Sequence, residues 1–460
     1  MDTKSLPISS PSMYILPQIT VQHDITVVMD DVRDGVVTSG SEDVWISCYL
    51  QGHESVHGKL RISKEPSGVS FHAMQGVEWQ GSTTADFRVS CPSLGIDPTP
   101  VRLAKRVYNP TGGQKKITAF DISPDGSIFA TGYDDGTILV TPASATSSEP
   151  RRIAKTHLST VLSVLFFPSS IVLLSTSSDL SAAVHDANLA SSSTLSTVRS
   201  LRAHSAGVTD CAIIDRGKNV VSFGRDACAR LWHVGEGREI VGRRWRAPKG
   251  SPILCGHVDA DWNSVLAEGN EARTSTQVLD GEVGTSGKVA FVGLQDGTIR
   301  GYELSTGVPR FYSSGALAKE RRTPIDSINY SAHHGTLVAG TRDGVVFIWN
   351  LRSLALSNET REGEDEERDV PPTVTLRRNK GGIESIVFGA VSTGSLPSIL
   401  FGSADGLLCR VGFTANDKPR LLEEYVGVES GDGIRSVRVS VVEGVEMVWC
   451  ASDDGNVRRY

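Results

Sequence analysis

The stretch His204–Trp232, with the sequence HSAGVTDCAIIDRGKNVVSFGRDACARLW, decides the fold. Its segment Val208–Ile214 alternates apolar and polar residues, and this period of two predicts a half-buried strand. A polar turn follows, and the apolar segment from Asn219 predicts a second strand. After a tight turn around Asp226, the segment that ends at Trp232 predicts a third. The stretch is therefore expected to form one sheet from consecutive short strands.

Four polar side chains of this stretch have the spacing of a WD repeat: His204, Ser222, Asp226 and Trp232. In such a repeat the Asp accepts from the His, the His meets the Ser hydroxyl, and the Ser accepts from the indole N–H. This chain of bonds satisfies polar groups that would otherwise be costly to bury. A His, Ser and Asp set could also be a catalytic triad, but no G-x-S-x-G segment accompanies it. We therefore interpret the four residues as a structural tetrad and expect no catalytic residue.

The same unit recurs along the chain. Together with Asp226 itself, the turn aspartates of the repeats are Asp135, Asp179, Asp226, Asp296, Asp343, Asp405 and Asp454. An apolar strand start precedes each turn, at Ile117, Val161, Val208, Ile253, Ile325, Ile383 and Ile434. A unit that recurs at the intervals between these positions is typical of a β-propeller. The expected fold is thus all-β: a seven-bladed WD-repeat β-propeller preceded by a small, mostly β N-terminal domain.

The domain organisation follows from where the repeats begin. Residues 1–100 lie outside them and are assigned to the N-terminal β-rich domain, and residues 101–460 to the propeller. The last repeat ends with its third strand, so the segment 101–109 is expected to supply the missing outer strand and to remove an exposed edge. The fourth repeat contains an insertion at 259–288, and an acidic run at 359–369 is expected to be a solvated loop.

Composition narrows the function. With 46 basic and 53 acidic residues the net charge is −7, which argues against nonspecific binding to nucleic acid or to an anionic membrane. The seven cysteines form no C-x-x-C pair, no apolar run approaches 18 residues, and the start lacks a secretory signal. Phosphate-binding and metal-binding motifs are missing as well. We expect a cytoplasmic and nuclear protein without cofactor or metal that is not an enzyme.

The candidate binding surface is the face of the ring that carries the aspartate turns, called the turn face below. In each blade, the residue after the inner-strand start and the residue before the turn aspartate are expected to project there. The charged members of these two sets are the predicted partner-binding residues, called the mouth residues: Asp134, Arg225, Asp326, Arg342, Glu384, Arg435 and Asp453. Such mixed charge favours a specific protein partner. We expect the chain itself to be a monomer.

A resemblance to a known family indicates a function, which the spacing of the repeats alone does not. The segment Thr209–Trp232 resembles the third repeat of the proteasomal ATPase-associated factor family, and the similarity extends to Trp45–Leu50, Glu282–Gly293 and Asp453–Tyr460. The resemblance implies a chaperone of 19S base assembly that binds the C-terminal domain of one ATPase-ring subunit of the proteasome. The acidic run and the fourth-repeat insertion depart from the family. Two alternatives stay open: a substrate receptor or scaffold of a ubiquitin ligase or other complex, and a propeller hydrolase.

Overall fold

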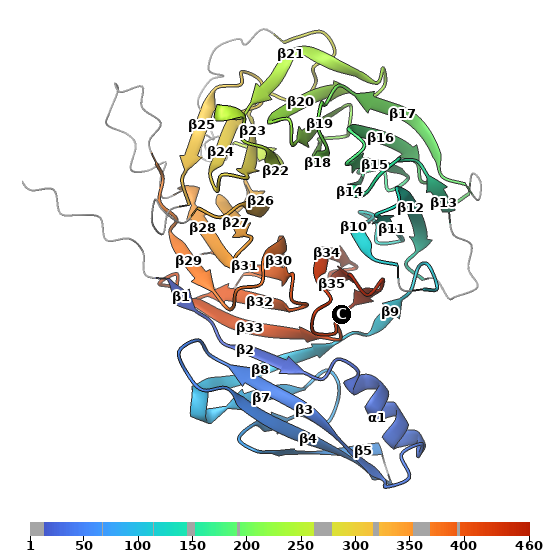
Figure 1. Ribbon diagram of the computed structural model, residues 1–460, viewed down its shortest axis with the longest axis vertical. Coiled ribbons are helices and arrows are strands. Elements are labelled where there is room, and N and C mark those ends of the chain that lie inside the picture. The colour runs from blue at the N-terminus through green and yellow to red at the C-terminus, as the bar shows by residue number, and fades with distance from the viewer. Residues whose placement is uncertain are drawn as a thin grey trace, which may run out of the picture.

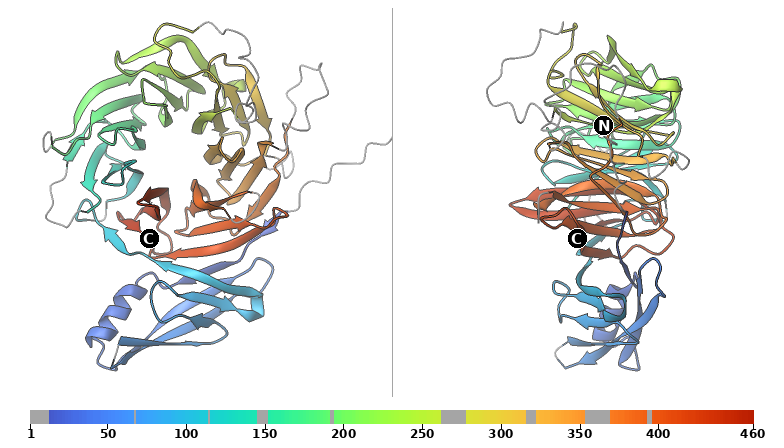
Figure 2. Two further views of the ribbon diagram at one scale, coloured as in Figure 1. Left: turned by 180° about the vertical axis from the view of Figure 1, so that it is seen from behind. Right: turned by 90° about the vertical axis from the view of Figure 1, so that its left-hand side faces the viewer.

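The computed structural model describes residues 13–66, 68–113, 115–144, 152–190, 194–261, 278–315, 322–352, 369–392 and 396–460. The expected all-β class is confirmed, because almost every regular element in these ranges is a strand. Short sheets follow one another around a ring, and a smaller N-terminal part lies against its rim (Figure 1). The N-terminal part leaves the opening of the ring uncovered (Figure 2).

Each sheet of the ring contains antiparallel strands that lie side by side, in an order that leads from the central opening to the rim (Figure 1). The first sheet contains β10 (Ile117–Ile122), β11 (Ile128–Tyr133), β12 (Thr137–Pro142) and β13 (Arg152–Lys155). The second contains β14 (Val161–Phe166), β15 (Val172–Ser177), β16 (Ser181–Asp186) and β17 (Ser196–Arg202). The third contains β18 (Val208–Ile214), β19 (Asn219–Gly224), β20 (Cys228–His233) and β21 (Arg238–Arg246), followed by the short 3-10 turn Pro248–Gly250.

The ring continues in the same way. The fourth sheet contains β22 (Ile253–Ala260), β23 (Lys288–Leu294), β24 (Ile299–Glu303) and β25 (Pro309–Ser313). The fifth contains β26 (Ile325–Ser331), β27 (Thr336–Thr341), β28 (Val345–Asn350) and β29 (Val374–Arg377). The sixth contains β30 (Ile383–Ser392), β31 (Pro397–Ser403), β32 (Leu408–Phe413) and β33 (Pro419–Val426). The seventh contains β34 (Ile434–Val442), β35 (Val445–Ser452), β36 (Val457–Arg459) and β9 (Arg106–Tyr108).

The apolar core of the ring is divided into layers, each of which lies between two neighbouring sheets. One layer joins the third and fourth sheets through residues such as Phe223 and Ala290. Another joins the seventh sheet to the first, where Trp449 packs with Phe120 and Phe129. Because the last sheet packs against the first, the ring is closed by side-chain burial as well as by strand pairing.

The N-terminal part has its own core. The strands β2 (Gln18–Val21), β3 (Ser41–Tyr49), β4 (Val56–Glu65) and β5 (Gly68–Met74) form an antiparallel sheet in that order. The helix α1 (Ile25–Asp34) packs on this sheet with Ile25, Val28 and Val32, whose spacing places them on one helix face. It ends at Gly35, which adopts the left-handed conformation (φ 81°) that favours glycine.

The junction between the two parts differs from the predicted domain division. The predicted boundary after residue 100 falls within β8 (Ile96–Leu103), which continues a sheet of β6 (Glu78–Gln80) and β7 (Arg88–Cys91). β8 pairs in parallel with β33, so these strands extend the sixth sheet of the ring. The short strand β1 (Tyr14–Ile15) pairs in parallel with β29 of the fifth sheet. The N-terminal part therefore covers the outer edges of two sheets.

The expected closing segment, 101–109, is shared between two sheets. Its part Arg106–Tyr108 forms β9 and pairs with β36 of the seventh sheet, whereas Val101–Leu103 pairs with β33 of the sixth. The pairing of Val101–Leu103 was not expected. Both pairings satisfy backbone groups at edges that would otherwise be open.

Parts of the two long insertions lie outside the described residues, namely 262–277 and 353–368, and with them nearly all of the acidic run. The end of the fourth-sheet insertion is described and contacts the third sheet. The Asn219 side chain donates to the carbonyl of Gly281 (3.0 Å) and accepts from the backbone N–H of Val283 (2.6 Å). This segment therefore ties the third sheet to the fourth.

Candidate interaction surface

The predicted tetrad of the third sheet forms one continuous chain of hydrogen bonds. The indole Nε1 of Trp232 donates to Ser222 Oγ (2.8 Å), and Ser222 Oγ lies 2.7 Å from His204 Nε2. His204 Nδ1 lies 2.9 Å from Asp226 Oδ1. Since the serine oxygen accepts from tryptophan, its own proton points to His204 Nε2, and the Nδ1 proton of histidine points to aspartate.

This order of atoms matches a hydrolytic Asp–His–Ser set, but the serine is out of reach of a substrate. Ser222 is 1% exposed and Trp232 2% exposed, so both lie inside the wall between the sheets. Burial raises the pKa of Asp226, but the bonds from His204 and from the backbone N–H groups of Ser205 and Cys228 outweigh it and hold the pKa at about 2. The chain of bonds therefore fixes the Asp226 turn at the turn face.

The second sheet builds a variant of this chain. His157 Nδ1 lies 3.0 Å from Asp179 Oδ2, and His157 Nε2 lies 2.7 Å from Ser175 Oγ. His185 stands where the third sheet has tryptophan, and its Nε2 lies 2.7 Å from the same serine oxygen. Burial, with a smaller contribution from His157, lowers the pKa of His185 to about 3, so this ring is neutral at physiological pH. A neutral imidazole can donate from Nε2 as an indole does.

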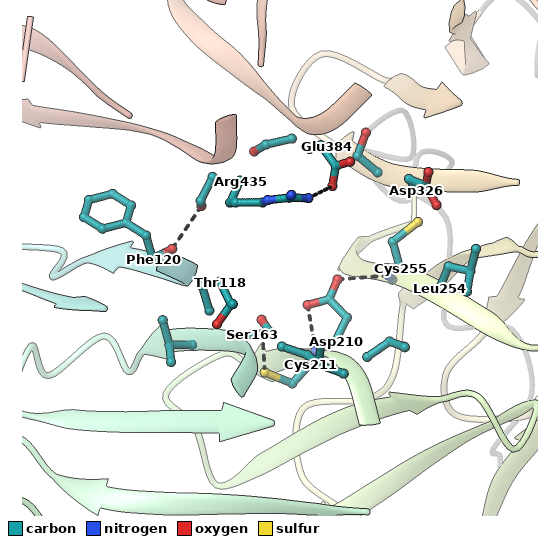
Figure 3. A pocket seen from close by; sticks show the side chains of 18 of the residues that line it. Thr118, Phe120, Ser163, Asp210, Cys211, Leu254, Cys255, Asp326, Glu384 and Arg435 are labelled. Atoms are coloured by element: carbon teal, nitrogen blue, oxygen red, sulfur yellow. Dashed lines mark hydrogen bonds and ion pairs between the residues drawn. The ribbon is translucent and has the colours of Figure 1, made fainter. Parts of the chain in front are cut away.

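The seven mouth residues line one cavity at the centre of the ring. It has a volume of about 710 Å³, and its wall is built by the inner strands of successive sheets. Arg435, Glu384 and Asp326 point toward the same opening in Figure 3. The structure thus brings together residues that are more than 300 positions apart in the sequence, such as Asp134 and Asp453.

Five of the seven charges are paired with one another rather than left open. Arg342 binds Asp326 through two hydrogen bonds of 2.8 and 2.9 Å. Arg435 binds Asp453 through two bonds of 2.8 Å and also reaches Glu384 of the sixth sheet at 3.2 Å (Figure 3). The expectation that all mouth charges are available to a partner needs correction for these five, because each already has an oppositely charged neighbour.

These ion pairs change the pKa values of charged mouth residues. The hydrogen bonds that Arg435 donates to Asp453 are the main cause that raises the pKa of Arg435, and those that Arg342 donates to Asp326 do the same for Arg342. Burial raises the pKa of Glu384, although Arg435 works against it. A signal for this pairing was present in the sequence, since the two mouth positions of one repeat carry opposite charges in Asp326 and Arg342 and again in Arg435 and Asp453.

Asp134 and Arg225 are the open charges of the mouth. Both are exposed, and no described residue lies within hydrogen-bond or ion-pair distance of the Asp134 carboxylate or the Arg225 guanidinium. The other mouth position of their sheets is a threonine, and each threonine hydroxyl binds the backbone of the next sheet. Thr118 donates to the carbonyl of Val161 (2.7 Å), and Thr209 to that of Ile253 (2.9 Å).

Arg438, which lines the cavity, forms a charge pair that the sequence did not reveal. Arg438 Nε donates to Asp121 Oδ1 (2.8 Å), and Asp121 Oδ2 accepts from the backbone N–H of Phe166 (2.8 Å). One carboxylate therefore joins the seventh, first and second sheets. Asp210 likewise joins two sheets, the third and the fourth, because its carboxylate accepts from the backbone N–H of Gly256 (3.1 Å).

The described part of the chain shows no candidate metal site and no candidate membrane-spanning helix. No group of three or more His, Cys, Asp or Glu side chains in it is placed to hold a metal ion. Among the described helices, none has the length and apolar character needed to cross a membrane.

The comparisons with known proteins agree with the repeat. Residues 104–140, 195–233 and 318–350 match the WD40 family, described as WD domain, G-beta repeat, which confirms the predicted WD repeats in these ranges. The chain is also similar to the protein named Proteasomal ATPase-associated factor 1 from Gallus gallus, with 30% identity over 134 residues. The aligned part covers 28% of this chain and 32% of that relative, so it spans about a third of the relative's length. WD40 repeats indicate a protein-interaction scaffold.

Proposed function

We propose that the chain is a seven-bladed WD-repeat propeller that serves as an assembly chaperone for the base of the 19S regulatory particle of the proteasome. Its partner in this proposal is the C-terminal domain of an ATPase-ring subunit, which docks on the turn face around the mouth. The chain acts as a monomer in the cytoplasm and nucleus, and it leaves before the mature particle forms. It has no catalytic role.

The observation that carries the proposal is the convergence of seven charged residues on one opening. A surface that exposes both signs of charge, at fixed positions on a rigid ring, selects a partner by orientation as well as by affinity. The paired residues are held in place by one another, which lowers the cost of ordering them on binding. The similarity to a relative named for association with a proteasomal ATPase supports the choice of partner.

A capture experiment tests this function. The tagged full chain is used as bait under native conditions, and the captured proteins are identified by mass spectrometry. We expect ATPase-ring subunits of the proteasome without core-particle subunits, because a chaperone leaves before the core particle joins. Capture of intact proteasomes, or of ubiquitin-ligase subunits without any ATPase subunit, would contradict the proposal.

A further inference from the structure

A sector of the turn face beside the mouth has a different character from the mouth itself. It lies over the second and third sheets, in the upper right part of the ring in Figure 1. We call it the basic arc, and it consists of Arg202, Arg225, Arg246 and Lys249 together with Leu158 and Leu180.

The strand register places these residues on one face. Arg202 pairs with Ser181, which directly follows the Asp179 turn, and Arg246 pairs with Cys228, which directly follows the Asp226 turn. Lys249 lies in the short 3-10 turn after Arg246. The two sheets are in contact at this level, because a side chain at Gly207, beside Arg225, would meet the backbone of Ser178 at 3.3 Å.

The charge of the arc is uncompensated. All four cations are exposed, and no carboxylate of the described residues lies within ion-pair distance of any of them. The nearby carboxylates of Asp179 and Asp226 are 8% and 4% exposed and are held by the histidines. This contrasts with the net charge of −7 for the whole chain and with the paired charges over the fifth to seventh sheets.

Two exposed leucines lie in the same sector. Leu158 is 87% exposed, and its backbone N–H binds Asp179, so the backbone that carries this side chain is fixed. Leu180 is 42% exposed and has a left-handed backbone (φ 71°). The equivalent residue after the turn aspartate is a glycine in five of the seven repeats, for example Gly136 and Gly344. A leucine in this conformation is strained, and such strain is kept where a side chain has a use.

We propose that the basic arc binds an acidic protein segment that carries apolar side chains. The cations attract carboxylates, and the leucines give the apolar contact that a purely ionic surface lacks. Exposed leucines favour a protein segment over nucleic acid, whose backbone offers phosphates but no apolar side chain. This assignment places the partner on the face used by the proposed function, but it is independent of the partner's identity as an ATPase subunit.

The test uses two matched variants of the full chain. In the charge variant, Arg202→Glu, Arg246→Glu and Lys249→Glu are combined, and Arg225 is kept because it also belongs to the mouth. In the apolar variant, Leu180→Gly removes the side chain and relieves the left-handed strain, so the melting temperature should stay unchanged or rise. The control is Arg216→Glu with Lys218→Glu, two exposed residues of the β18–β19 turn at the opposite end of the third sheet.

The probe is a labelled synthetic peptide rich in glutamate and leucine, titrated at low and high salt. We expect the charge variant to weaken binding about tenfold, since several exposed ion pairs are lost and replaced by repulsion. The difference should shrink at high salt. Leu180→Gly should weaken binding without lowering the melting temperature, and the control should bind as the unchanged chain does. Binding that is unaffected by both arc variants overturns the inference.

Two further arms separate this inference from the proposed function. A peptide with serine in place of leucine, and an oligonucleotide of equal charge, should bind more weakly. Equal binding of the oligonucleotide would overturn the choice of a protein segment. The purified ATPase C-terminal domain is titrated in parallel: if the peptide binds through the arc and the domain does not bind, the arc stands and the proposed function fails. If instead the domain binds, the peptide does not bind and the arc variants do not change binding of the domain, the inference about the basic arc is overturned while the proposed function stands.

Discussion

At the scale of single residues, Asp226 and its neighbour Arg225 are expected to have different roles: Asp226 stabilises the fold, and Arg225 binds the partner. Asp226 accepts from His204 and from two backbone N–H groups inside the tetrad, whereas Arg225 is exposed at the mouth. We expect Asp226→Ala to destabilise the third sheet by about 1–3 kcal/mol for each donor left without an acceptor. Arg225→Ala should leave the melting temperature nearly unchanged and weaken partner binding. Thermal melts of the two variants decide this, and equal losses would contradict the division of tasks.

The same aspartate predicts a pH dependence. Its pKa is about 2 in the folded chain against 3.8 for an ordinary aspartate, so the ionised form is favoured by folding. The stability it adds is present above pH 3.8 and is lost as the pH falls toward 2. In Asp226→Asn this contribution is absent at every pH. The difference in melting temperature between the unchanged chain and Asp226→Asn should therefore narrow as the pH is lowered below about 4. A difference that stays constant would show that Asp226 is not held by these bonds.

At the scale of elements, β9 closes the ring with a buried aromatic residue. The aromatic side chain of Tyr108 packs on Phe129 (5.2 Å between ring centroids) and on Trp449 (5.9 Å). Its hydroxyl donates to the carbonyl of Ala143. Tyr108→Ala should cost about 3–5 kcal/mol, as removal of a buried aromatic side chain does. The control is Val107→Ala in the same strand, where a 55% exposed side chain should change stability by about 0.5 kcal/mol or less. Denaturant unfolding of both variants measures this, and similar effects would mean that β9 does not hold the ring closed.

The N-terminal segment is attached through a buried ion pair. Arg378 and Glu424 are 4% and 3% exposed and bind each other, and Glu424 accepts from the backbone N–H of Ile19 (3.1 Å). Arg378 in turn donates to the carbonyl of Pro17 (3.0 Å). Glu424→Ala leaves a buried guanidinium without its partner and should cost about 3–5 kcal/mol.

The same substitution should make the segment around Ile19 sensitive to protease, which limited proteolysis would detect. Arg102→Ala serves as the control, because its pair with Glu423 is partly exposed and is worth about 0–1 kcal/mol. Protection from protease in Glu424→Ala would show that the segment is held by other contacts.

At the scale of the whole molecule, the sequence predicted features that recur with the repeat. The turn aspartates and apolar strand starts repeat in every unit, so the order of the sheets and the location of the mouth could be read from them. The contact of Arg435 with Glu384 was missed, because the two residues lie on neighbouring sheets that only the assembled ring brings together. The attachment of the N-terminal part was missed for the same reason. No local pattern indicates that Tyr14 lies beside Leu376 or that Val101 lies beside Glu424.

Binding of an ATPase-ring C-terminal domain at the mouth can be measured by calorimetric titration. The purified domain is titrated into the unchanged chain, into Asp134→Ala with Arg225→Ala, and into a control with Arg216→Ala and Lys218→Ala at the opposite end of the third sheet. Binding at the mouth predicts that the control binds as the unchanged chain does and that loss of the two open mouth charges weakens binding about tenfold, an effect that diminishes at high salt. Equal affinity of the mouth variant and the control would contradict it.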